Sequence, residues 1–329
     1  MRHIAIDDPR PFARVAPRDL AEAAALGARP GTVFFAGGGD LLDQLKTRRL
    51  TPAALVDLKG LPGLRGVEET EEAVAVGALT TLSAIARDPR RRSVAPALCT
   101  AASRVATPQI RNTATLGGNL LQDSRCAYYR EGWRCRRAGG RTCYAHEGLN
   151  GEHAIFGGGP CWTVTPSDLA PVLVALEAEL SVHGPGGERR MPAADLFVDP
   201  VADVQRMHAL EPGEILTRVR IPAEPARRSR FVKVAVRGAW DFALASAAVA
   251  ADVTDGRLTA CRVVLGGVAP TPRRCLRAEA VLEGAEPTSN RIEAAAEAAL
   301  IGAAPEPENA YRVALVRQAV VDALTEIVQ

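Results

Sequence analysis

Apolar and polar positions in the first third of the chain change in short blocks separated by glycine and proline. Blocks with helical spacing predict helices at residues 19–26 and 40–45, a helix opening near Thr81, and a small-residue helix at 93–105. Apolar or alternating blocks predict strands at 32–36, 55–58 and 73–77. This order of helices and strands is typical of a mixed α/β fold.

The second half continues with an amphipathic helix over residues 165–180, for which Thr165 or Ser167 is the candidate N-cap. Strands are predicted at 180–183 and 215–221, and a stretch rich in Pro, Ala and Arg at 222–230 is the best candidate for a linker. Beyond it we expect a smaller α+β unit, with strands at 231–236 and 261–267 and helices at 244–251, 291–301 and 309–327.

Composition narrows the class of protein. A chain of 329 residues that is 47% hydrophobic can bury one large core or two ordinary ones. With 40 basic and 38 acidic residues the net charge is +2, so we expect no dedicated nucleic-acid binding. No apolar run reaches the roughly 18 residues of a membrane span, and acids and prolines stand where a signal peptide is apolar. We expect a cytoplasmic protein, whose export would depend on another chain.

Two glycine-bearing segments are candidate phosphate loops. Gly37, Gly38, Gly39 and Asp40 follow a predicted strand, where unhindered backbone N–H groups can surround phosphate oxygens. Position 42 is Leu, so this is not a Rossmann fingerprint, and a Walker lysine is absent. Residues 113–119 offer two more glycines with hydroxyl and amide side chains. Together the loops fit a dinucleotide held mainly by backbone contacts; two unrelated turns are the alternative.

Residues 123–160 break the pattern of helices and strands and are rich in Arg, Gly, Tyr and Cys. Four of the seven cysteines fall in or just after this segment with the spacing C-x8-C-x7-C-x17-C: Cys126, Cys135, Cys143 and Cys161. Four thiolates match a [4Fe-4S] cluster, whose negative charge the nearby arginines would offset. The short C-x2-C pairs usual in zinc sites are absent, which favours iron–sulfur over zinc, with free thiols as the third possibility. We interpret His146 and His153 as loop residues rather than ligands.

Six motifs in order along the chain resemble one known family: FAGGGDLL from Phe35, GALTTL from Gly77, ATPQIRNTATLGGNL from Ala106, TPSDLAP from Thr165, FVKVAVRGAWDFALAS from Phe231 and LGGVAPTPRR from Leu265. They are similar to the FAD-binding medium subunit of the molybdenum hydroxylases, the group of xanthine dehydrogenase and carbon monoxide dehydrogenase. The cysteine-bearing segment resembles the branch with an additional [4Fe-4S] cluster, found in periplasmic aldehyde oxidoreductases and 4-hydroxybenzoyl-CoA reductase, and looks closer to the aldehyde-oxidising type.

The resemblance implies an α+β fold. A vanillyl-alcohol-oxidase or PCMH-type FAD-binding domain in two subdomains would precede a CO-dehydrogenase-flavoprotein-like C-terminal α+β domain. In this chain the first domain would span residues 1–222, with subdomains 1–60 and 61–222, and the second would span 228–329. The iron–sulfur loop, 121–162, would belong to the second subdomain.

The resemblance also implies which residues hold FAD. The first loop would surround the pyrophosphate with Phe35, Ala36, Gly37, Gly38, Gly39, Asp40 and Leu41. The second would do so with Ala114, Thr115, Gly118 and Asn119. Ala106, Thr107 and Ile110 would lie near the adenine or ribityl portion, and the flavin would contact Asp168, Ile215, Leu216, Lys233, Asp241, Phe242 and Ala243. Many relatives have Thr or Gln and then Ser where this chain has Gly39-Asp40, so the resemblance carries over the backbone contacts of this loop but not the hydroxyl contact.

By the same resemblance the chain carries electrons and no catalytic residues for substrate chemistry. Its partners would be a large molybdopterin-binding subunit and a small [2Fe-2S] subunit, and it would pass electrons to an external acceptor in an aldehyde- or xanthine-dehydrogenase-type complex. A reductase of the 4-hydroxybenzoyl-CoA type would run electrons the other way. Two other classes are a non-redox binding module stabilised by zinc and a self-contained FAD oxidase, for which the chain is short and lacks an evident catalytic Tyr or His.

Overall fold

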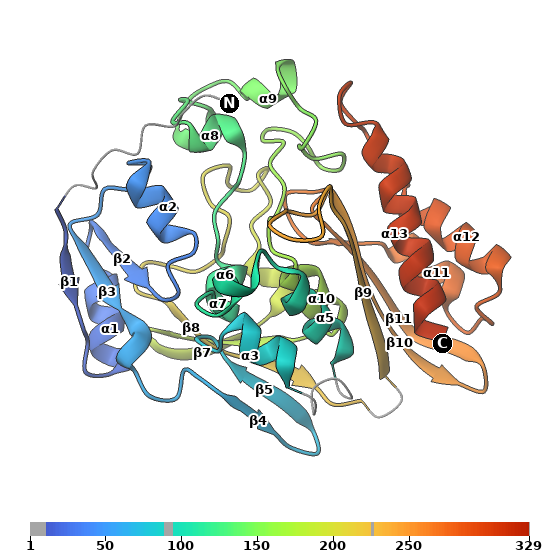
Figure 1. Ribbon diagram of the computed structural model, residues 1–329, viewed down its shortest axis with the longest axis horizontal. Coiled ribbons are helices and arrows are strands. Elements are labelled where there is room, and N and C mark those ends of the chain that lie inside the picture. The colour runs from blue at the N-terminus through green and yellow to red at the C-terminus, as the bar shows by residue number, and fades with distance from the viewer. Residues whose placement is uncertain (1–10, 89–94, 225–226, 329) are drawn as a thin grey trace.

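The computed structural model describes residues 11–88, 95–224 and 227–328 of the chain. Three β-sheets follow one another along the long axis of the molecule, from the N-terminal sheet at one end to the C-terminal sheet and its helices at the other (Figure 1). Three buried apolar clusters follow the same order, and the middle one also includes Phe231 and Ala248 of the C-terminal sheet. Among the residues described, no helix is both long enough and apolar enough to cross a membrane.

The N-terminal sheet is three-stranded and parallel, in the order β1-β3-β2. Asp19 caps the first helix by accepting a hydrogen bond from the Glu22 backbone N–H. Ala23 and Ala24 of that helix pack with Val56 in the small core of this unit. Its elements are β1 (Ala13–Val15), α1 (Leu20–Gly27), β2 (Thr32–Phe35), α2 (Leu41–Lys46), β3 (Ala54–Asp57) and the 3-10 turn η1 (Leu58–Gly60).

The middle unit contains a five-stranded antiparallel sheet in the order β4-β5-β8-β6-β7. Short helices cover it, and Leu82, Leu116 and Leu173 are fully buried between them. Its elements are β4 (Val67–Glu69), β5 (Ala73–Gly77), α3 (Leu82–Arg87), α5 (Pro96–Arg104), α6 (Pro108–Arg111), α7 (Leu116–Leu120), α10 (Leu169–Ala175), β6 (Glu179–Gly184), β7 (Gly187–Pro192), η3 (Ala193–Leu196) and β8 (Ile215–Pro222).

The cysteine-bearing segment is ordered by three short helical turns that lie at the edge of the molecule above the middle unit in Figure 1. They are α8 (Ala127–Arg130), η2 (Arg136–Ala138) and α9 (Tyr144–Glu147). The segment therefore has defined structure, as its length inside a compact chain predicts.

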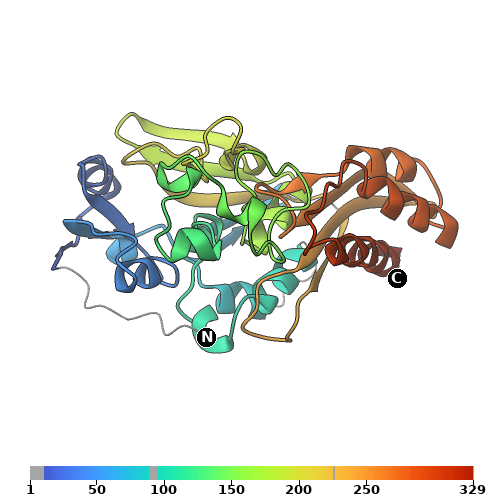
Figure 2. The same cartoon turned by 90° about the horizontal axis from the view of Figure 1, so that it is seen from above.

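The C-terminal sheet is four-stranded and antiparallel, in the order β12-β11-β10-β9. The long helix α13 packs along β9 and β10, and Figure 2 shows it with the other C-terminal helices at one end of the molecule. Helices α10 and α5 of the middle unit also contact this sheet. Its elements are β9 (Arg227–Val234), β10 (Ala245–Thr254), β11 (Arg257–Gly266), β12 (Arg273–Arg274), α11 (Leu276–Leu282), α12 (Ser289–Ala299) and α13 (Tyr311–Val328).

Three local predictions are wrong. The helix predicted at 244–251 is strand β10, because it pairs with neighbours on both sides and needs small side chains under the helices that cover it. Helix α10 is not amphipathic: all seven of its residues are buried. The predicted linker 222–230 is largely structured, since β8 ends at Pro222 and β9 begins at Arg227. Residues 93–94 of the helix predicted at 93–105, and residues 225–226 of the predicted linker, lie outside the described residues.

Candidate functional site

A cavity of about 560 Å³ lies where the N-terminal sheet meets the middle unit. Its wall combines residues from the loop after β2, from helices α6 and α7, from the start of β8 and from residues 240–242 near the C-terminal sheet. Its volume is in the range of small-molecule and cofactor sites. The predicted FAD residues come from these same places in the chain.

The first glycine loop forms one end of the cavity. Gly38 has a φ of +78°, a conformation that favours glycine. No acceptor in the described part of the chain receives a hydrogen bond from the backbone N–H groups of Gly37, Gly38 or Gly39. These three donors are therefore available to an anionic ligand.

The second glycine loop lies directly against the first. A Cβ on Gly37 would lie 2.2 Å from the carbonyl oxygen of Thr113, so only glycine permits this approach. Within the second loop, Thr115 accepts a hydrogen bond from the Gly118 N–H at 3.2 Å, and the Asn119 side chain accepts one from the Ser167 hydroxyl at 2.6 Å. The structure thus brings the two candidate phosphate loops together in one wall.

Most of the FAD residues implied by the resemblance line this cavity. Those that do so are Ala36, Gly37, Gly38, Gly39, Asp40, Leu41, Ala106, Ile110, Ala114, Thr115, Gly118, Asn119, Asp168, Ile215, Leu216, Asp241 and Phe242. Phe35, Thr107, Lys233 and Ala243 are not in the lining. The Phe35 ring lies under the Lys59 ammonium at 3.4 Å, and Thr107 caps α6 by accepting from the Ile110 N–H.

Lys233 contacts two acidic residues that line the cavity, Asp168 and Asp241. Its ammonium lies 2.6 Å from the Asp168 carboxylate and donates to the Asp241 carbonyl at 2.8 Å. Burial raises the pKa of the Asp168 carboxyl above its ordinary value, and the charge of Lys233 opposes this shift. The lysine therefore fixes two residues that are predicted to contact the flavin.

The rim of the cavity is strained and aromatic. Ala106 and Trp240 both have positive φ values, 43° and 55°, and the Trp240 N–H donates to the Ala106 carbonyl at 3.2 Å. Trp240 is 66% exposed and Phe242 47% exposed, so two large apolar side chains face solvent at this rim. Non-glycine residues held at positive φ are concentrated at functional sites.

Several lining residues were not predicted from the sequence. Gln44 is 5% exposed and its Oε1 has no hydrogen-bond partner among the described residues, which is uncommon for a buried amide. Burial lowers the pKa of His208 to about 4, so the imidazole is neutral near pH 7. Arg125 also lines the cavity, and its position next to Cys126 is the one sequence signal that could have identified it.

The four cysteines of the segment line one small internal void: Cys126, Cys135, Cys143 and Cys161. All are free thiols, and Cys135 and Cys161 are buried. Burial raises the pKa of Cys126 and of Cys161 to about 11. The fold therefore gathers thiols that are far apart in the sequence. The other cysteines, Cys99, Cys261 and Cys275, are buried elsewhere in the chain.

Aromatic rings surround this void. The Trp133 ring centroid lies 5.3 Å from that of Tyr128 and 4.9 Å from that of Tyr144, both nearly edge-on. His153 Nε2 lies 3.2 Å from the Cys126 sulfur, whereas His146 is outside the void and interacts with Glu306 at 2.8 Å. His153 is thus a neighbour of the cysteine group, a contact that the sequence did not indicate.

Within the described residues, no group of three or more His, Cys, Asp or Glu side chains is arranged to hold a metal ion. Four thiolates on a single zinc ion, each about 2.3 Å from the metal, would lie within about 4 Å of one another. In the described part of the chain the four cysteines are therefore not arranged as a preformed site for zinc or for any other single metal ion.

Comparison with known proteins agrees with this geometry. Residues 10–224 match the family model of the FAD binding domain in molybdopterin dehydrogenase, and residues 230–327 match that of the CO dehydrogenase flavoprotein C-terminal domain. The chain is 35% identical to the aldehyde oxidoreductase FAD-binding subunit PaoB of Escherichia coli K12, over 93% of this chain and 95% of that protein.

Solved structures are similar over almost the whole chain. A chain of carbon monoxide dehydrogenase from Hydrogenophaga pseudoflava aligns with a TM-score of 0.77 at 28% identity, covering 97% of this chain and 98% of its own. A chain of quinoline 2-oxidoreductase from Pseudomonas putida 86 aligns with a TM-score of 0.77 at 26% identity, covering 98% and 99%. The predicted fold class is confirmed.

Proposed function

This chain belongs to the FAD-binding subunits of the molybdenum hydroxylases, and we propose that it carries both FAD and a [4Fe-4S] cluster as the electron-transfer subunit of such a complex. The observation that carries the proposal is the adjacency of two sites. The cavity with both glycine loops includes Arg125, and the next residue, Cys126, lines the void of the four cysteines.

The residues present fit a flavin dinucleotide. The free N–H groups of the first loop and the close approach at Gly37 suit a pyrophosphate, which needs donors and little steric bulk. Asp168, Ile215 and Asp241 would contact the flavin portion. Bound FAD supplies a two-electron store that exchanges electrons with one- and two-electron partners.

The chain's own side chains would orient the flavin and keep its surroundings constant. Lys233 holds Asp168 and the Asp241 carbonyl in place, so these groups do not reorient when charge at the flavin changes. His208 is neutral near pH 7 and adds no charge to the cavity. Trp240 and Phe242 stand at the rim, where an external acceptor would approach.

The cysteine donor set fits an iron–sulfur cluster better than zinc. In a [4Fe-4S] cluster each cysteine binds a different iron, so the sulfurs need wider spacing than around one ion. The proposal of a cluster is supported by the four cysteines that line one void and by the lack of the short C-x2-C pairs usual in zinc sites. Arg137 is 8% exposed beside the void, where its charge would offset that of four thiolates.

The oxidation of aldehydes is the reaction we propose for the whole complex, on the basis of the 35% identity to an aldehyde oxidoreductase subunit. The partners would be a large molybdopterin chain, where substrate reacts, and a small [2Fe-2S] chain that delivers electrons to this flavin. We propose cytoplasmic assembly, with any export directed by a partner's twin-arginine signal.

The test is anaerobic reduction of the complex, purified with its native partners, by a panel of aldehydes and purines. Bleaching of flavin and iron–sulfur absorption by aldehydes is expected, and bleaching by purines alone would contradict the aldehyde assignment. The variant Cys135→Ser separates the roles of the cluster: loss of iron with an unchanged rate of flavin reduction would exclude a relay on the path to the flavin.

A further inference from the structure

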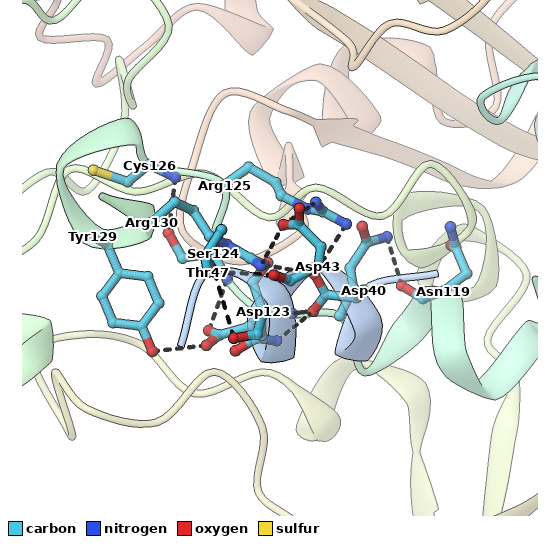
Figure 3. A network of polar contacts seen from close by, with 12 residues as sticks. Asp40, Asp43, Thr47, Asn119, Asp123, Ser124, Arg125, Cys126, Tyr129 and Arg130 are labelled. Atoms are coloured by element: carbon cyan, nitrogen blue, oxygen red, sulfur yellow. Dashed lines mark hydrogen bonds and ion pairs between the residues drawn. The ribbon is translucent and has the colours of Figure 1, made fainter. Parts of the chain in front are cut away.

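Asp40 is the residue at which the first glycine loop meets the cysteine-bearing segment, residues 123–161 (Figure 3). It occupies the N-cap position of α2 but makes no capping hydrogen bond with its side chain. Its carboxylate instead accepts from the backbone N–H of Asp123 at 2.8 Å and from Gln44 at 2.9 Å. An N-cap Asp that does not cap its helix indicates that the side chain is used elsewhere.

Two arginines of the cysteine-bearing segment complete this contact. Arg130 lies 2.7 Å from the Asp40 carboxylate and Arg125 lies 3.0 Å from it. The Asp40 and Arg130 side chains are only 12% and 11% exposed, so this pair is poorly screened by solvent. The same arginines reach Asp43 at 3.3 Å and 3.8 Å, but that carboxylate is 51% exposed.

From Asp40 the contacts continue to the cysteines. Arg130 donates to the Ser124 carbonyl at 2.5 Å, and the Ser124 hydroxyl accepts from the Cys126 N–H at 3.2 Å. Asp123 accepts from the Tyr129 hydroxyl at 2.8 Å and pairs with Arg137, which lies two residues after Cys135. The position of Asp40 therefore depends on the backbone conformation of the segment that contains Cys126 and Cys135.

The other side of Asp40 is the FAD cavity. Asp40 and Arg125 both line it, and the Arg125 guanidinium lies 5.1 Å from the centroid of the Phe242 ring, which lines it too. Burial lowers the pKa of Arg125, and its Nε has no hydrogen-bond partner in the described part of the chain. An aspartate beside a phosphate loop would repel a pyrophosphate, and the two arginines offset that charge.

We propose that Asp40 is a positioning residue that couples the two sites, so that FAD binding and occupation of the cysteine site each strengthen the other. This inference rests on the proposed function. The coupling is reciprocal by thermodynamic necessity: a cluster that fixes Arg125 and Arg130 fixes the glycine loop, and a dinucleotide that fixes the loop slows loss of iron.

The test measures FAD affinity of the full chain, in its complex, with and without iron. Iron is removed in Cys135→Ser, and by a chelator from the wild-type protein. We expect FAD affinity to fall about tenfold on iron loss and by a similar factor in Asp40→Ser. The double variant is expected to lose no more than either single one. Asp43→Asn is the matched control, on the same helix and facing the same arginines, and should change FAD affinity less than about twofold.

A second readout is the rate of iron release to a chelator with FAD bound and with FAD removed. FAD should slow release several-fold in the wild-type protein and have no effect in Asp40→Ser. Asp40→Asn, which keeps an acceptor for the Asp123 N–H, replaces the serine variant if circular dichroism shows that the latter is unfolded.

Additive losses in the double variant, or FAD affinity unchanged by iron removal, would overturn the coupling. A wild-type complex that contains neither FAD nor iron would instead contradict the proposed function.

Discussion

Replacing Gly37 by alanine should separate the two glycine loops and weaken FAD binding. The new Cβ would lie 2.2 Å from the Thr113 carbonyl oxygen, 3.0 Å from its carbonyl carbon and 3.1 Å from the Ala114 Cα. All three are backbone atoms, which cannot rotate away as the end of a flexible side chain would. The first loop must therefore move relative to the second.

The free energy lost in Gly37→Ala can be estimated from the size of the clash. Overpacking in a well-packed region costs about 1–3 kcal/mol, and a backbone clash belongs at the upper end. A loss of about 3 kcal/mol lowers the unfolding midpoint by roughly 6–12 °C in a domain of this size. If the loops must be pulled back together to hold the dinucleotide, the same free energy weakens FAD binding roughly 100-fold.

Two other glycines provide controls for this experiment. A Cβ on Gly60 or on Gly39 meets no protein atom within 4 Å. Gly60→Ala should leave both thermal stability and FAD affinity unchanged. Gly39→Ala, within the first loop itself, should leave the stability of the FAD-free chain unchanged. Thermal unfolding and flavin fluorescence titration measure the two quantities, and Gly37→Ala with wild-type values of both would refute the reasoning.

Three further predictions concern buried polar groups and the cysteines. Lys233→Met leaves the buried Asp168 unpaired, which costs about 3–5 kcal/mol when the carboxylate is charged. Because the folded state then holds the Asp168 proton more tightly than the unfolded state, the stability deficit should grow as pH rises from acid to neutral; a pH-independent deficit in urea unfolding would contradict this. Arg312→Met removes the donor to the carbonyls of His153, Leu244 and Gly267 and should cost more than about 2 kcal/mol in urea unfolding. Arg317→Met, on the same helix with only exposed ion pairs, should cost less than about 1 kcal/mol, and equal costs would be contrary evidence. Cys143→Ser should abolish iron binding while Cys275→Ser, whose thiol is buried away from the void, retains it; iron analysis decides, and iron retained in both variants would mean that Cys143 is not a ligand.

Much of the fold was predictable because most segments satisfy local rules. Asp19 is an N-cap ahead of a helical pattern, and the short apolar block of β5 forms a strand that is buried along almost its whole length. The alanine-rich β10 breaks this agreement: its composition favours a helix, and only its pairing with β9 and β11 makes it a strand. Whether β9 and β11 lie beside this segment depends on residues outside it, so the local pattern cannot predict the pairing.

Some residues of the candidate site were also predictable from the sequence, and others were not. The glycine loops and the four cysteines carry their chemistry in residue type and spacing, so they were recognisable in the sequence. Gln44 and His208 have no such signal, since they belong to the site only because distant segments meet at the cavity. Asp40 was identified as a departure from the family pattern, but its ion pairs with Arg125 and Arg130 depend on the folded path of the cysteine-bearing segment.

The central claim is that one chain holds FAD between two glycine loops and a four-iron cluster on four cysteines. Quantitative flavin and metal analysis of the complex, isolated without oxygen from cells that also make its partners, tests this most directly. The account predicts one FAD and about four irons on this chain after the partner clusters are subtracted. Zinc in place of iron, or a chain without flavin, would contradict it.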